Sequence, residues 1–169
     1  MARFSCSLPP AAAQQRGAVL IVALVFLLLL TMIGISSMQN ATLQEKMAGS
    51  VSLRNTTFQL AEAALRVGEN AVAKSSYTLA VCNSTTNCAP PATTAVTAAG
   101  AGANGVTWVS AQSGTATTVA LYGVQFIGTT ADPVNFDGEA GTSVKLYRIT
   151  AIGISGSART VLESIYAKQ

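Results

Sequence analysis

QQRGAVLIVALVFLLLLTMIGI is the stretch from Gln14 to Ile35, and it decides the fold of this chain. From Gly17 to Gln44 there is no Asp, Glu, Lys or Arg. The apolar run from Ala18 to Ile35 is 18 residues long. As an α-helix such a run spans about 27 Å, close to the roughly 30 Å of a bilayer's hydrocarbon core. Residues 18–35 are therefore predicted to be the membrane-spanning part of a helix.

Basic residues precede the apolar run and predict its orientation. Arg3 and Arg16 both lie before it, and the cytoplasmic side of a span carries the excess of Lys and Arg. Met1 to Gly17 is therefore expected in the cytoplasm, and the body that follows the span is expected outside it. A secretory signal peptide has a shorter core, about 7–15 residues, with small residues at its cleavage site. Gly34-Ile35-Ser36 matches such a site weakly, so cleavage there stays an alternative, as does an uncleaved signal anchor.

The composition excludes several classes of function. The chain has 169 residues, 50% hydrophobic and 10% charged, which suits one domain with an appendage. Once Arg3 and Arg16 are set aside, eight basic residues (10 minus 2) face seven acidic ones with no basic cluster, so no nucleic acid partner is expected. The absence of histidine excludes Ser-His-Asp and Cys-His nucleophiles and zinc sites with histidine ligands. Because P-loop, G-x-G-x-x-G and paired C-x-x-C motifs are also missing, we expect neither an enzyme nor a cofactor.

Residues 36–76 contain no proline and carry a helical pattern. Arg54 falls on the side of the helix where the other residues are apolar or small. We interpret it as lying at the edge of that side, with its aliphatic stem buried and its charged end in water; a salt bridge to a neighbouring subunit is the alternative. Glu62 and Arg66 stand four apart in the order that favours an ion pair. This amphipathic helix is expected to continue the apolar one and to bury one face under a sheet. The predicted packing face recurs in steps of three, four or seven, at Leu43, Met47, Val51, Phe58, Ala61, Leu65, Gly68 and Val72.

Residues 77–169 are predicted to be an exported α+β head. The segments 118–127 and 144–154 are rich in β-branched and aromatic residues, as strands are. Gly156-Ser157 predicts a turn, after which 158–166 returns as the second strand of an antiparallel hairpin. We expect a small antiparallel sheet of about four strands laid on the helix.

Two features of the head bear on its stability and surface. Cys82 and Cys88 reach an oxidising compartment, so we predict a disulfide, worth about 2–2.5 kcal/mol in the chain-entropy model. Two free thiols are the alternative. Residues 89–120 are rich in Ala, Thr, Gly and Ser and predict a long variable loop with one or two short strands, among them Val106–Val109. Such a loop is either a functional face or plain connecting structure.

An acidic turn lies between the predicted strands. Its oxygen-bearing side chains are typical of Ca²⁺ ligands, although their spacing is not that of an EF-hand. A solvated turn is the simpler interpretation, so these residues are only weak metal candidates. They are Asp132, Asn135, Asp137 and Glu139.

The N-terminal region resembles that of a known family. A short basic leader that ends in glycine and runs directly into an apolar helix is similar to a class III prepilin. Leu43-Gln44-Glu45-Lys46-Met47-Ala48-Gly49, Arg54-Asn55 and the segment from Phe58 to Arg66 resemble PilX-type minor pilins over about residues 15–70. The resemblance implies a pilin-like fold, cleavage between Gly17 and Ala18 by the prepilin peptidase, and methylation of Ala18. The proline that many family members carry is replaced by Gln39, so no sharp kink is expected.

One departure from the family pattern suggests a position in the filament. Major pilins carry a glutamate at the fifth mature residue, where this chain has Val22. A carboxylate in an apolar environment is costly unless it is paired, and its family partner is the amino terminus of the subunit added before it. A subunit with none above it lacks that partner, so Val22 suggests the filament tip. The alternative is that Val22 is one more lipid-facing residue.

The resemblance implies a minor pilin that primes type IV pilus assembly and so supports twitching motility and adhesion. Its implied partners are other minor pilins, the major pilin, the inner-membrane assembly platform and a large tip adhesin. The implied location is the inner membrane before assembly and the pilus afterwards. The alternatives are a tip pseudopilin of a type II secretion system and a membrane-anchored binding module or adhesin outside any filament.

Overall fold

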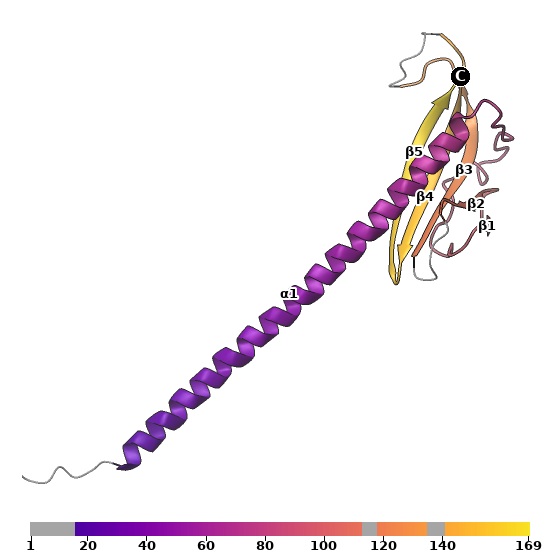
Figure 1. The fold of residues 1–169 in the computed structure, drawn as a ribbon. Coiled ribbons are helices and arrows are strands. Elements are labelled where there is room, and N and C mark those ends of the chain that lie inside the picture. Colours follow the sequence, from indigo (N-terminus) through magenta and orange to yellow (C-terminus); the bar gives the residue numbers. More distant parts are fainter. Residues whose placement is uncertain (1–15, 113–117, 135–140) are drawn as a thin grey trace, which may run out of the picture. The chain divides into compact units, whose positions relative to one another are not determined.

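A computed structural model describes residues 16–112, 118–134 and 141–169 of the chain, and these residues form one helix and five strands. The chain divides into two compact units, Met1–Met47 and Ala48–Gln169. The described part of the first unit is helical throughout. In order, the elements are α1 (Arg16–Ala73), β1 (Gly100–Ala101), β2 (Thr107–Ser110), β3 (Thr118–Thr130), β4 (Val144–Ser155) and β5 (Ala158–Lys168) (Figure 1).

The single helix is long because nothing in its sequence stops it. α1 has 58 residues, and no proline occurs between Pro10 and Pro90. It ends at Ala73, slightly before the predicted end near Ser76. A turn follows, in which the backbone N–H of Tyr77 donates to the carbonyl of Lys74 at 3.0 Å. Consecutive serines favour such a turn because their hydroxyls compete for backbone groups.

The sheet is an antiparallel meander in the order β1-β2-β3-β4-β5. β3 and β4 pair along their whole lengths, from Thr118 opposite Ser155 to Thr130 opposite Val144. The predicted hairpin of β4 and β5 is confirmed, and Gly156 in its turn has a φ of 57°, a conformation that glycine adopts without strain. The fifth strand, beyond the four or so expected, is the two-residue β1. The predicted α+β fold is confirmed.

The two faces of the sheet are covered differently. The C-terminal part of α1 lies across one face, here called the helix face (Figure 1). On it Tyr147 and Ile149 of β4 form a core cluster with Val72 of α1. On the opposite face, here called the coil face, Leu121 of β3 and Ile152 of β4 cluster with residues of the β2 region. The head is therefore built from a helix, a sheet and a layer of irregular chain.

Candidate functional site

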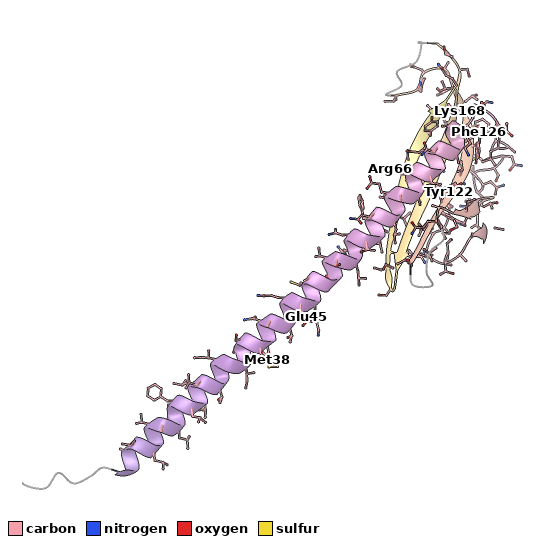
Figure 2. The ribbon with its side chains drawn as sticks, in the orientation of Figure 1. Met38, Glu45, Arg66, Tyr122, Phe126 and Lys168 are labelled. Carbon is pink, nitrogen blue, oxygen red and sulfur yellow. A yellow bond between two sulfur atoms is a disulfide. The ribbon has the colours of Figure 1, made fainter. Side chains whose placement is uncertain are left out.

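The first half of α1 carries apolar side chains on every side and buries none of them. Residues 17–55 are exposed, with Val22 at 53% and Phe26 at 62%. Figure 2 labels Met38 on this part of the helix, where its side chain is 72% exposed. Among the described residues one helix, α1, is long and apolar enough to cross a membrane. Exposed apolar area on this scale is stable only against lipid or other apolar surfaces.

Two hydroxyl groups within this apolar segment are bonded to the helix itself. Thr31 Oγ1 donates to the carbonyl of Leu28 at 2.8 Å, and Ser36 Oγ donates to the carbonyl of Met32 at 3.0 Å. Hydroxyls bonded to a preceding turn do not need water. The segment is therefore suited to a bilayer or a helix bundle, where no water is available to unpaired polar groups.

Small residues of α1 form the face that contacts the sheet. They are spaced by four, three, four and four positions, which keeps them on one side of a helix. Adding a Cβ to Gly68 would bring it within 2.7 Å of Ile149 Cγ2, so the helix backbone lies close to the strand there. We call this set the small-residue face: Thr57, Ala61, Ala64, Gly68 and Val72, all of them buried.

The packing face predicted from the sequence overlaps with the small-residue face only in part. Ala61 and Val72 are fully buried and Leu65 packs at the edge of the core. Phe58 stays 49% exposed, and the three members before it, Leu43, Met47 and Val51, are exposed. Thr57 and Ala64 were not predicted, because the predicted pattern follows mainly bulky apolar residues. A search for small residues at helical spacing would have found them.

Polar side chains attach the irregular chain to the coil face. Nε2 of the buried Gln125 donates to the carbonyls of Asn87 at 2.7 Å and Ala89 at 3.0 Å. Arg148 Nη1 donates to the carbonyl of Cys88 at 2.7 Å, and Arg148 Nε lies 3.3 Å from Glu163 Oε1 in an ion pair. These bonds attach the half-buried residues 87–89 to the sheet.

The disulfide predicted from the sequence lies in the same segment. Cys82 and Cys88 are bonded, with their Cα atoms 5.3 Å apart. The backbone N–H of Cys82 donates to the carbonyl of Phe126 at 2.9 Å, and Val81 forms an isolated bridge to Phe126. One end of the disulfide loop is thus attached to β3 by backbone pairing and the other end by Gln125 and Arg148.

Two family models match this chain in two separate segments. The PilX N-terminal model matches residues 16–66. The model for the type IV pilus assembly protein PilX C-term matches residues 78–168. The chain belongs to the PilX family. No curated protein and no solved structure matches it.

Membership of the PilX family gives the general role of the chain. PilX proteins are pilins that act in type IV pilus assembly, a structural family and not an enzyme family. Their partners therefore belong to the pilus machinery. For a PilX pilin, the exposed apolar half of α1 indicates a protein that lies in a membrane and then in a pilus.

The cleavage, methylation and tip positions predicted from the sequence lie at the start of α1. Gly17 and Ala18 occupy the first turn of the helix, which begins at Arg16. A Cβ added to Gly17 would meet no atom within 4 Å. Val22 follows one turn later and is exposed. The roles of these three residues stay predictions.

The acidic turn offers no metal site among the described residues. Asp132 is exposed, and its backbone N–H donates to Thr130 Oγ1. Asn135, Asp137 and Glu139 lie outside the described residues. Within the described ranges, no group of three His, Cys, Asp or Glu side chains is placed to hold a metal ion. Calcium binding stays a weak prediction.

Proposed function

We propose that this chain is a minor pilin that primes type IV pilus assembly at or near the filament tip. Residues 1–17 are its leader, which the prepilin peptidase removes by cutting between Gly17 and Ala18, and Ala18 is then methylated. Residues 18–35 hold the protein in the inner membrane with its N-terminus in the cytoplasm. Residues 36–76 continue the helix, and residues 77–169 are the exported head, in which residues 89–120 are the variable loop.

The observation that carries this proposal is the division of α1 between two kinds of environment. Its C-terminal part is packed on a sheet, and its first part is apolar and uncovered. A PilX pilin with such a helix can pass from lipid to a bundle of similar helices without exposing apolar surface to water. The partners that suit this transfer are other minor pilins, the major pilin and the inner-membrane assembly platform, with a large tip adhesin beyond the head.

The tip position is proposed because of Val22. A subunit that has others above it gains from a carboxylate at this position, paired with an amino terminus. A subunit with none above it would bury that carboxylate unpaired, so valine is the less costly residue there. The free amine of Ala18 would still attract a carboxylate of the subunit added below.

The primary test is the amount of pilin that can be sheared from cells lacking this protein, in a normal strain and in one that cannot retract pili. Loss of pili that is partly reversed without retraction supports priming. Unchanged pili together with an exported enzyme held in the periplasm would identify a type II secretion pseudopilin and end the proposal. The mass of the mature N-terminus tests cleavage after Gly17, which an adhesin outside a filament would lack.

The tip position has its own test, in which Val22→Glu is compared with Val25→Glu. Both residues are valines of similar exposure, 53% and 51%, so the two variants add the same charge to the same apolar helix. The tip proposal expects Val22→Glu to lower the number of pili, with immunogold label still at the tip. If initiation is unchanged and label spreads evenly along the shaft, the tip position is wrong. Val25→Glu controls for the cost of any carboxylate in the segment.

A further inference from the structure

A groove on the head is lined almost entirely by small uncharged residues. It has a volume of about 380 Å³ and lies between residues 92–98, residues 101–103 and Trp108. Five of its nine lining residues are alanine. Between Lys74 and Asp132 the sequence contains no charged residue at all. Charged residues are depleted at the centres of protein interfaces, so an uncharged groove favours an uncharged partner.

Trp108 brings an unpaired donor to this groove. The side chain is 2% exposed, and its Nε1 has no hydrogen-bond acceptor among the described residues. A buried donor without an acceptor costs roughly 1–3 kcal/mol, so native proteins contain few of them. A phenylalanine would fill most of the same space without that cost.

The orientation of the Trp108 ring is fixed by glycines on both sides. A Cβ at Gly102 would lie 2.4 Å from Nε1, and a Cβ at Gly123 would lie 3.2 Å from Cε3 of the ring. A side chain at Gly102 would therefore collide with the ring and one at Gly123 would crowd it, and the edge that carries Nε1 faces Gly102 in the groove wall. The indole cannot turn to find another acceptor without displacing the core around it.

Gly102 covers Nε1, so an acceptor from outside reaches this atom only when the segment at Gly102 moves. Gly100, Asn104 and Gly105 have positive φ values of 142°, 57° and 68°, so this short loop is built from residues that tolerate unusual backbone angles. The same loop contains β1, which is an edge strand and pairs on one side only, with β2. Edge strands present free backbone groups to an added chain.

We propose that this groove binds an uncharged, extended peptide segment of another pilus subunit, with a backbone carbonyl of that segment accepting the Nε1–H of Trp108. An extended peptide supplies both the acceptor and the strand that the edge at β1 can pair with. A sugar is a poorer fit, because Thr97 and Trp108 are the only lining residues with polar side-chain atoms. The proposal rests on the pilus-assembly function proposed above.

Trp108 is the single tryptophan of the chain, which gives the experiment a unique reporter. The full chain with a ¹⁵N-labelled indole, in detergent, is titrated with each other minor pilin of the same pilus system, purified in the same detergent. One of them is expected to shift the indole resonance, and its affinity should change less than about two-fold between low and high salt, because no charge takes part. If no subunit shifts it, or if a mixture of neutral hexoses shifts it instead, the proposal is overturned.

Two variants complete the test. Trp108→Phe removes the donor and keeps an aromatic ring, so it should weaken that binding by about 3–10-fold while the melting temperature changes by only a few degrees. Ala95→Glu places a charge in the groove, and its neighbour Thr94→Glu adds the same charge to an exposed position that does not line it. Ala95→Glu should reduce sheared pili and Thr94→Glu should not.

The groove and the proposed function fail in different ways. If deletion of the whole protein leaves piliation intact, the priming function is wrong. If deletion removes the pili but Trp108→Phe and Ala95→Glu restore them as well as the wild type does, the groove proposal alone is wrong.

Discussion

Replacement of Gly153 by alanine tests how closely α1 must lie on the sheet. Gly153 is in β4, and the structure places a Cβ added there 2.1 Å from the carbonyl oxygen of Thr57 and 2.7 Å from the backbone nitrogen of Ala61. Both atoms belong to the helix backbone, which cannot move aside as a flexible side chain can. The strand and the helix must therefore separate by about 1 Å to restore normal contacts.

The cost of that separation follows from what the contact holds. Forcing an extra carbon into a close-packed site costs typically about 1–3 kcal/mol. The hydroxyls of Thr57 and Thr160 share a hydrogen bond of 2.8 Å beside Gly153, and stretching it costs about 1 kcal/mol more. The loss of glycine's freedom in the unfolded chain returns about 0.4–1 kcal/mol. We expect a net loss of about 2–3 kcal/mol, or roughly 10 °C in melting temperature.

The assay is thermal unfolding of the full chain in detergent, followed by the fluorescence of Trp108. Gly49→Ala is the control, because a Cβ at Gly49 meets nothing within 4 Å and alanine is the better helix former. Its effect should be neutral or stabilising. Gly68→Ala should fall between the two, because its obstacles are the side chains of Ile149 and Tyr122. If Gly153→Ala melts within about 2 °C of the wild type, the close helix–sheet contact inferred here is wrong.

Three further predictions concern the coil face and the aromatic cluster. Gln125→Leu should lower the free energy of unfolding by about 2–4 kcal/mol, measured by denaturant titration, because the carbonyl of Asn87 loses its donor and that of Ala89 keeps only the 3.5 Å bond from Asn104; a loss below 0.5 kcal/mol would contradict this. The double variant Cys82→Ser/Cys88→Ser should lower the free energy of unfolding by about 2–2.5 kcal/mol, and a reductant should have no further effect on the melting temperature of this variant. Burial, with smaller contributions from Tyr122 and Tyr147, raises the pKa of Tyr77 above 10.0. The unfolded chain therefore loses this proton first, so stability should fall as pH rises above about 10, and Tyr77→Phe should reduce that slope.

Much of the architecture could be predicted because its signals are local. The apolar run, the absence of proline and the strand-like segments each depend on neighbours in sequence, and α1, β3, β4 and β5 all follow from them. The hairpin turn at Gly156 was predictable for the same reason. β1 was not, because two residues carry no periodicity and are held there by pairing with Thr107 and Trp108.

The contacts between elements could not be predicted in the same way. In the sequence Gln125 does not differ from other polar strand residues. Its role appears only in the folded chain, where it contacts the carbonyls of Asn87 and Ala89, which lie 38 and 36 positions away in sequence. Gly153 and Gly68 belong to no sequence motif. Each must be glycine only because another element of the folded chain packs closely against it. The unpaired Nε1 of Trp108 is likewise visible only when its surroundings are known.

The distribution of side-chain size around α1 explains how one helix serves both the head and the pilus. Its small residues are used by its own sheet, since only they allow backbone approach at Gly153 and Gly68. Bulky residues such as Val51 and Phe58, 56% and 49% exposed, are thereby left on other sides of the helix. Full burial of such side chains is worth about 1.5–3 kcal/mol each, a gain that folding of the head leaves unused. Had the sheet packed on the bulky stripe, the head would be more stable alone and would have less apolar surface to offer another subunit. The choice of small residues for internal packing therefore keeps the free energy of burial available for assembly.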